Sequence, residues 1–153
     1  MNFFIGGIMQ GSYVEKKLYP QDYRTRIKNV IQKNFQNAHV FSPIEQHPNS
    51  LDYAYVKGAE AFFDIMRKAG DSDVVITYAP EASMGTAVEM WEGFRNSKTV
   101  ICISPMTDNW TVKFLSHKVM PTMEEFEAFV DRGDLARLIN DIATKKYRKE
   151  ASL

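Results

Sequence analysis

The sequence predicts an α/β fold, a three-layer sandwich in which a mostly parallel sheet of four to five strands lies between two layers of helices. The first observation is that short apolar runs alternate with longer segments whose apolar residues recur every three or four positions. This is the order of strands and crossover helices in a parallel sheet. The second is the run DVVITYA at 73–79, apolar almost throughout, as a strand covered on both faces should be. Because no linker, repeat or low-complexity tract interrupts the chain, we expect a single domain over residues 1–153.

The expected strands are short and end at, or are followed by, glycine, proline or serine residues that favour turns. They lie at 2–7, 38–43, 73–79 and 99–104, with a weaker candidate at 117–121. The apolar spacing predicts helices over 20–35, 51–69, 84–96, 122–133 and 135–149. We expect a loop over 44–50 and a loop with a short helix over 106–116.

Helical spacing also predicts which side chains face the core. The expected core faces are Tyr23, Ile27, Val30 and Ile31 in the first helix, Tyr55, Ala59, Phe62 and Met66 in the second, and Ala87, Met90, Trp91 and Phe94 in the third. Thr122 is expected to cap the helix that it begins, because Glu125 follows three residues later and completes a capping box.

An irregular apolar stretch after Pro105 contains Trp110, Phe114 and Met120. Two interpretations carry equal weight, namely contact with another copy of the chain and packing beneath the final helix. We expect a homodimer or a larger homo-oligomer.

The composition is that of a folded protein, with 44% hydrophobic and 25% charged residues among 153. The 19 basic and 19 acidic side chains cancel, so no overall field attracts nucleic acid or a membrane, and we expect neither as a partner. No apolar run approaches the roughly 18 residues that a membrane span needs. The N-terminus also lacks a basic leader with a cleavage site. The expected location is therefore the cytoplasm.

Residues suited to metal or disulfide chemistry are few. Cys102 is the one cysteine, which excludes an intrachain disulfide. The histidines at 39, 47 and 117 do not have the spacing of metal ligands. We expect no metal and no cofactor.

Four loops follow the expected strands at their carboxyl ends, where ligands bind in parallel α/β sheets. Their sequences are GGIMQGS, SPIEQHPNS, APEASMG and SPMTDNW. The first holds Gly6, Gly7 and Gly11, which permit a ligand to approach the backbone closely. It matches neither the dinucleotide-binding pattern G-x-G-x-x-G nor a P-loop. From these residues alone, a flexible turn without a ligand is an equal alternative.

The segment PEASMGTAVEMWEG at 80–93 has the more specific pattern. Ser83 is expected to cap the helix, and Gly85 and Thr86 follow where backbone amides meet the positive end of the helix dipole. Such a turn suits an anion such as phosphate, although ordinary helix capping explains the same residues. Glu89 is expected on a small polar face of this helix, away from the core and pointing toward an anion at the N-terminus.

Three segments together resemble the nucleoside 2-deoxyribosyltransferase superfamily, which includes transferases and 2'-deoxynucleoside 5'-monophosphate N-glycosidases. They are FFIGGIMQGS, FFDIMRKAGDSDVVITYAPEASMGTAVEM and the strand that follows, about residues 3–104. The resemblance implies the flavodoxin-like or Rossmann-like form of the three-layer sandwich. It also implies cleavage of the N-glycosidic bond of a nucleoside or a nucleoside 5'-monophosphate.

By this resemblance, Glu89 matches the nucleophile that attacks the sugar C1', and Asp64 matches the aspartate that assists departure of the base. Ser83, Gly85 and Thr86 match a loop that holds the 5'-phosphate in the monophosphate glycosidases. The other expected substrate contacts lie in the first turn, at Gly6, Gly7, Ile8, Gly11 and Ser12.

The chain departs from the family pattern at several positions. Phe3 stands where many members carry a tyrosine, and Gly7 and Met9 stand where the glycosidases have a serine and an arginine. Ser12 offers a hydroxyl in the same turn. A weaker similarity extends to Ser116, which lies where those enzymes present a serine across a dimer interface.

Several functions therefore remain open. Attack by water would make the protein a hydrolase, and attack by a second base would make it a 2-deoxyribosyltransferase. A non-catalytic nucleotide-binding or sensing domain is favoured by the missing hydroxyl at Phe3 and opposed by Glu89. An FMN carrier would need a hydroxyl-rich turn after the first strand, and GGIMQGS is poor in hydroxyls.

Overall fold

The strands of the computed structural model, which describes residues 1–11 and 13–145, form one parallel sheet in the order β2-β1-β3-β4-β5. They are β1 Asn2–Gly7, β2 His39–Phe41, β3 Val74–Tyr78, β4 Thr99–Ile103 and β5 Lys118–Met120. The predicted parallel sheet is confirmed, and the weak candidate at 117–121 is β5, one of its two edge strands. The chain builds outward from β1 to β2 and then in the other direction from β3. The strand order therefore reverses between β1 and β3, where doubly wound sheets bind ligands.

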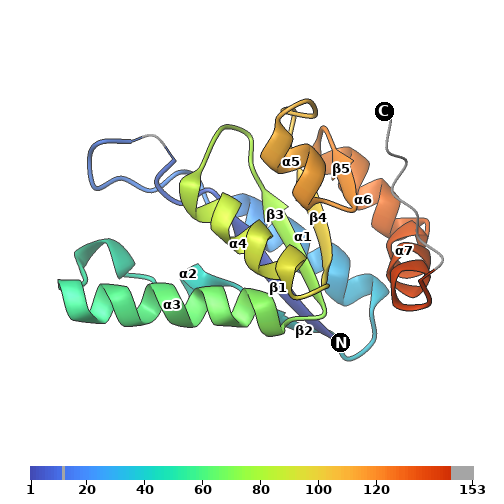
Figure 1. Ribbon diagram of the computed structural model, residues 1–153, viewed down its shortest axis with the longest axis horizontal. Coiled ribbons are helices and arrows are strands. Elements are labelled where there is room, and N and C mark those ends of the chain that lie inside the picture. The colour runs from blue at the N-terminus through green and yellow to red at the C-terminus, as the bar shows by residue number, and fades with distance from the viewer. Residues whose placement is uncertain (12, 146–153) are drawn as a thin grey trace.

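Helices cover both faces of this sheet (Figure 1). One layer holds α1 Asp22–Asn34, α6 Met123–Asp131 and α7 Asp134–Ala143, and the other holds α3 Tyr55–Asp71, α4 Met84–Arg95 and α5 Trp110–Leu115. The segment expected to be a loop at 44–50 instead contains α2 Pro43–Gln46, and the short 3-10 helix η1 Ser50–Asp52 precedes α3. The part of the last predicted helix beyond 145 lies outside the described residues.

The strands alternate between two apolar cores, as the period of two in a β-strand requires. Phe3 and Ile5 point toward α1, α6 and α7, whereas Phe4 between them points toward α3, α4 and α5. The buried face of α1 carries Tyr23 and Ile27 as predicted.

The core faces predicted for α3 and α4 are partly wrong. Tyr55, Phe62, Trp91 and Phe94 are exposed. The buried residues are instead Ala61, Ile65, Met66, Ala69 and Gly70 in α3, and Thr86, Glu89, Met90 and Gly93 in α4. A Cβ at Gly93 would lie 2.8 Å from Cγ2 of Val75 on the sheet. The missing side chain lets α4 approach the sheet on this side, and the aromatic side chains turn outward.

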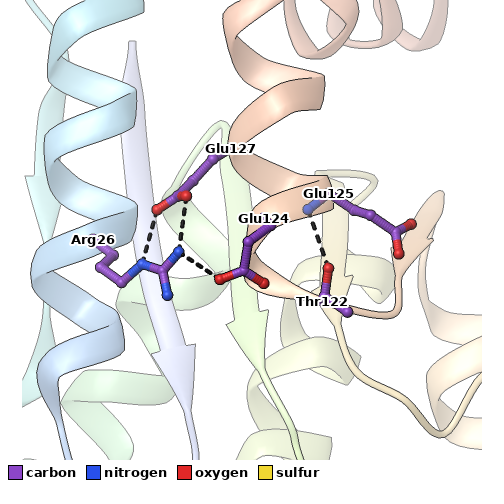
Figure 2. A network of polar contacts seen from close by, with 5 residues as sticks. All are labelled: Arg26, Thr122, Glu124, Glu125 and Glu127. Atoms are coloured by element: carbon purple, nitrogen blue, oxygen red, sulfur yellow. Dashed lines mark hydrogen bonds and ion pairs between the residues drawn. The ribbon is translucent and has the colours of Figure 1, made fainter.

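Polar contacts join α1 to α6 on the outer side of their layer, as Figure 2 shows. Arg26 donates to Glu127 through Nε and Nη2 at 2.9 and 2.8 Å, and to Glu124 through Nη2 at 2.9 Å. The Oγ1 of Thr122 accepts a 3.2 Å hydrogen bond from the backbone N–H of Glu125. The predicted cap of this helix is therefore confirmed.

One part of the apolar stretch after Pro105 packs inside the protein, and contact of the rest with another copy of the chain stays a prediction. Trp110 and Phe114 on α5 are exposed, whereas Met120 is buried in the core beneath α6.

No helix within residues 1–11 and 13–145 is both long and apolar enough to cross a lipid bilayer.

Candidate functional site

Glu89 lies in the interior, on the side of α4 that faces the sheet. It is 4% exposed, and its Oε2 accepts a 2.9 Å hydrogen bond from the backbone N–H of Gly7 at the end of β1. The prediction that Glu89 occupies a polar face is wrong, because Thr86, Glu89 and Gly93 share the buried stripe of α4. The carboxylate therefore sits at the carboxyl end of β1, where the strand order reverses.

The two glycines that end β1 make this arrangement sterically feasible. A Cβ on Gly6 would overlap Oε2 of Glu89 and lie 3.0 Å from its Cδ. Gly7 has a φ of +139°, and a Cβ there would lie 2.7 Å from the carbonyl oxygen of Tyr78. Gly6 is therefore needed for the packing of Glu89, and Gly7 for the backbone conformation that aims its N–H at the carboxylate.

Arg24 is a site residue that the sequence analysis missed. It is buried on α1, and its guanidinium donates to the backbone carbonyls of Ile5 and Gly7. The sequence does contain a signal for the burial of Arg24. This residue precedes Ile27 by three positions and Ile31 by seven, and it therefore shares their buried stripe. An arginine in that register needs polar partners inside the protein, and the end of β1 supplies them.

Burial raises the pKa of Glu89 from 4.5 to about 7, while the charge of Arg24 and the hydrogen bond from Gly7 act in the opposite direction. Desolvation disfavours the charged form of a carboxyl group. Glu89 therefore changes its protonation state near neutral pH, as groups that work as bases or nucleophiles in enzymes often do.

A tyrosine hydroxyl does lie at the end of β1, but it belongs to Tyr23 on α1 and not to position 3 on β1, where the family pattern has a tyrosine. Phe3 is buried in the core against Phe35. Tyr23 on α1 stacks on Tyr78 and donates a 3.1 Å hydrogen bond to the carbonyl of Ile8. Burial raises the pKa of Tyr23, and the charge of Glu89 raises it further, so its hydroxyl stays protonated at neutral pH.

A pocket of about 310 Å³ opens beside the N-terminus of α4. Its walls come from three of the four predicted loops and include Gly11, Ser83, Thr86, Met90 and Asn109. Ser83 caps α4 as predicted, and its Oγ accepts hydrogen bonds from the backbone N–H and the hydroxyl of Thr86, at 3.5 and 3.0 Å. Thr86 and Met90, on either side of Glu89 along α4, both line the pocket.

Asp64 lies elsewhere, on α3. It forms ion pairs with Lys68, at 2.9 Å, and with Arg67. The hydrogen bond from Lys68 is the main reason that the pKa of Asp64 lies below its usual value. The side chain lines a second pocket of about 280 Å³ with His47, which belongs to the predicted loop SPIEQHPNS, and with Tyr53, which follows that loop. The two predicted catalytic carboxylates thus do not line one pocket, because Asp64 lines this second pocket and Glu89 is buried. Asp64 is ionised at neutral pH.

The other predicted substrate contacts are dispersed. Ile8 is buried, and its N–H donates to the carbonyl of Tyr78. Gly85 is exposed, with open space where a Cβ would stand. Ser116 is buried at the end of α5, and its contact across an interface stays a prediction. Ser12 lies outside the described residues.

Within residues 1–11 and 13–145, no group of three or more His, Cys, Asp and Glu side chains is arranged to hold a metal ion. Cys102 is buried, and burial raises the pKa of its thiol to about 11. Thiolate chemistry at neutral pH is therefore disfavoured at this position.

Solved structures share this architecture. A 2-deoxyribosyltransferase from the psychrotolerant bacterium Bacillus psychrosaccharolyticus is similar over 90% of this chain and 96% of its own, with a TM-score of 0.64 and 17% sequence identity. The chain has the fold of a 2-deoxyribosyltransferase. A conserved protein from Enterococcus faecalis V583 is similar over 86% of this chain and 97% of its own, with a TM-score of 0.60 and 13% identity.

The three-layer fold implied by the sequence resemblance is thereby confirmed. No protein-family model and no curated protein sequence matches the chain. At these identities the likeness to solved structures concerns the fold, and the chemistry has to be argued from the site.

Proposed function

We propose that this protein cleaves the N-glycosidic bond of a nucleoside or a nucleoside 5'-monophosphate, with Glu89 as the nucleophile. The observation that carries the proposal is a buried carboxylate at the point where the strand order reverses. Its pKa is about 7, and it is held by the N–H of Gly7. The 2-deoxyribosyltransferase of similar fold is a biocatalyst for the synthesis of nucleosides, which agrees with this class of substrate.

The proposed reaction has two steps. Ionised Glu89 attacks the sugar C1', the bond from C1' to the base nitrogen breaks, and the base leaves with the bonding electrons and takes up a proton. Water then attacks C1' and releases the sugar from Glu89, while a second base in place of water would yield a new nucleoside. Glu89 must be ionised to attack. With a pKa of about 7, its reactive fraction rises from roughly one half at pH 7 to roughly nine tenths at pH 8.

The pocket beside α4 suits the sugar and its 5'-phosphate. Backbone N–H groups of the first turn of α4 stand at the positive end of the helix dipole, which favours an anion. Because Ser83 Oγ accepts both bonds from Thr86, its own O–H can donate to a phosphate oxygen. Charge-assisted hydrogen bonds contribute about 1.5–3 kcal/mol each, so two of them suffice to favour the monophosphate over the nucleoside.

Asp64 would act as an acceptor that orients the base. A carboxylate that Lys68 and Arg67 keep ionised can accept hydrogen bonds from ring or exocyclic N–H groups. It is a weak proton donor at neutral pH. The proton taken up by the departing base would then come from water.

One observation favours a second candidate function, a nucleotide-binding domain without catalysis. Glu89 is 4% exposed and is not among the residues that line the pocket beside α4, so a substrate in this pocket reaches the carboxylate only after a change in the structure. A domain that binds a nucleotide in the pocket and never exposes Glu89 would have the same resting structure.

The experiment that separates these functions follows release of free base from ribo- and deoxyribonucleosides and from their 5'-monophosphates. The wild-type protein is compared with Glu89→Gln and with Glu92→Gln. Glu92 is a matched control, because it lies three residues further along α4 and pairs with Arg95 at 2.6 Å. We expect Glu89→Gln to lower kcat by at least about 10³-fold, as loss of a nucleophile does, and Glu92→Gln to retain activity.

The outcomes are distinct. Base release only in the presence of a second base would identify a transferase, and release into water a hydrolase. Absence of release from every substrate, together with saturable binding of a monophosphate, would replace the catalytic proposal by the binding one. Equal activity in Glu89→Gln and wild type would exclude Glu89 as the nucleophile.

A further inference from the structure

His47 and Asp64 line one pocket although they come from different elements. The segment that holds α2 and η1 folds back along the first half of α3 (Figure 1). His47 follows α2, Tyr53 follows η1, and all three side chains line the pocket of about 280 Å³. Ionised Asp64 can accept a hydrogen bond from a base, but it cannot donate one to the ring as the base departs.

The imidazole of His47 offers the donor that Asp64 lacks. Its Nδ1 lies 3.3 Å from the hydroxyl oxygen of Tyr53. Its Nε2 is buried, and it has no hydrogen-bond partner among the residues that the structure describes. Leaving a buried polar nitrogen unpaired is costly. Because the ring lines the pocket, a rotation about its side-chain bonds brings Nε2 to a ligand there.

The charge of Asp64 favours a hydrogen on Nε2. When the Tyr53 hydroxyl donates to Nδ1, the neutral imidazole carries its hydrogen on Nε2, and a protonated imidazole carries one there as well. The remaining tautomer would turn a lone pair toward a carboxylate. The hydrogen bond from Lys68 is the main cause of the low pKa of Asp64, and a positive charge on His47 acts in the same direction. The two side chains are therefore close enough to interact electrostatically.

Space remains between these two side chains for a ring. In the part of the chain that the structure describes, no hydrogen bond or ion pair joins His47 to Asp64. Asp64 pairs with Lys68 and Arg67, but a carboxylate has about four lone-pair sites. A ligand that carries an acceptor next to a donor can thus bond to His47 and Asp64 at once.

The N7 edge of a 6-aminopurine has this pair of groups. N7 is an acceptor and the neighbouring amino group is a donor, whereas a 6-oxopurine presents two acceptors on the same edge. N7 also belongs to the five-membered ring that holds N9. The electron pair that N9 receives when its bond to C1' breaks is therefore shared with N7. A donor at N7 stabilises the departing base more than it stabilises the bound substrate.

We propose that His47 donates a hydrogen bond from Nε2 to N7 of a 6-aminopurine while Asp64 accepts one from the amino group, which selects this base and assists its departure. This assignment rests on the proposed cleavage of the N-glycosidic bond. His47 keeps its hydrogen, and water supplies the proton that the base takes up. A purine also suits the separation of the two carboxylates. Since Glu89 does not line the pocket of Asp64, the base has to extend from one to the other, and two fused rings reach further than one.

Binding to the Glu89→Gln protein tests recognition apart from catalysis. In calorimetry, 2'-deoxyadenosine 5'-monophosphate should bind at least about tenfold more tightly than the inosine analogue, which has an oxygen in place of the amino group. Asp64→Asn can donate to that oxygen, so it should abolish or reverse the preference. Asp71→Asn, exposed at the other end of α3, should keep it. Equal affinities for the two nucleotides in the Asp64 protein would overturn the proposal.

Replacing N7 by carbon isolates the contact with His47. The 7-deaza analogue of the adenine nucleotide keeps its shape and lacks the acceptor, so its affinity should be lower by about tenfold. His47→Phe keeps an aromatic ring beside Tyr53 and removes Nε2, and it should bind the two nucleotides alike. The same loss of affinity for the 7-deaza analogue in both proteins would refute the bond.

Turnover tests the assistance to departure in a chain that retains Glu89. His47→Phe should lower kcat for the adenine nucleotide by about 10²-fold, as loss of one donor to a developing charge does. For the N7-methylated nucleotide, whose ring is already positive, the loss should stay below about threefold. His47→Gln, which has an amide N–H, should recover part of the rate, and His39→Phe, exposed on β2, should retain it. Equal losses for both substrates would mean that His47 is only structural.

The two proposals fail in different ways. Base release that depends on Glu89 but is equally fast from adenine and hypoxanthine nucleotides would uphold the reaction and overturn the role of His47. Selective binding of the adenine nucleotide without any release would uphold recognition by His47 and overturn the reaction. Neither binding nor release would overturn both.

Discussion

The two helical layers cover the same sheet but present different surfaces to solvent. Around α1 and α6 the outer surface is charged, with Arg26 bridging Glu124 and Glu127. Around α3, α4 and α5 the outer surface holds exposed aromatic side chains such as Phe63 and Trp91. Covering one face of a sheet requires only one apolar stripe per helix. The first layer stops there, and the second carries an additional stripe that the protomer leaves uncovered.

The layers also differ in what they bring to the end of β1. The layer of α1 supplies the positive charge of Arg24, and the layer of α4 supplies the carboxylate of Glu89. Gly7 connects them, because its N–H donates to Glu89 and its carbonyl accepts from Arg24. The following substitutions compare the buried charges of Arg24 and Glu89 with the exposed ion pairs of Arg26.

The largest effect on stability is expected for Arg24→Met. Removing one member of a buried pair of charges destabilises a protein by about 3–5 kcal/mol. In this variant the carbonyls of Ile5 and Gly7 lose their donor, and Glu89 loses a nearby opposite charge. Urea denaturation measures this loss. Since Arg24 lowers the pKa of Glu89, the rising limb of the rate profile should also move to higher pH. A rate reduced by the same factor at every pH would mean that Arg24 is only structural.

Glu89→Gln should change how stability depends on pH. The pKa of Glu89 is 4.5 ordinarily and about 7 in the folded protein, so the folded state holds the proton more tightly than the unfolded chain. Wild-type stability therefore falls as pH rises from about 4.5 to about 7, by about 3 kcal/mol in total. Denaturation at pH 5 and pH 8 should show this loss in the wild type and not in Glu89→Gln. Parallel pH curves for the two proteins would contradict the raised pKa.

Gly6→Ala should destabilise the protein by about 1–3 kcal/mol, the usual effect of overpacking a core. The new methyl group would collide with the carboxylate of Glu89. In a Glu89→Ala background most of this collision is removed, so the cost of Gly6→Ala should fall by at least half. A double-mutant cycle measured by denaturation supplies the coupling, and strictly additive effects would refute the contact.

The smallest effect is expected for Arg26→Met, which removes the network of Figure 2. Its side chain is 43% exposed, and exposed ion pairs contribute about 0–1 kcal/mol that salt screens further. Denaturation in low and high salt should give a difference from wild type that shrinks as salt is added. A loss as large as that of Arg24→Met would erase the contrast between the buried and the exposed arginine of α1.

Much of the fold was predictable because its signals are local. Strand ends, the helix caps at Ser83 and Thr122, and the continuously apolar β3 follow from residues close together in the chain. The glycines at the end of β1 and the segment around Glu89 were also recognisable as candidate site residues. What remained open was how these segments face one another.

The sequence by itself determined the order of strands and helices and the residue types that serve the site. Only the tertiary structure decided that Glu89 points inward, because that depends on Gly93 fitting against Val75 and on a hydrogen bond to Gly7, 82 residues away in the chain. It also decided that Trp91 lies outside, since two apolar stripes on one helix compete for a single sheet face. Helical periodicity identifies both stripes, and only packing selects the one that is buried.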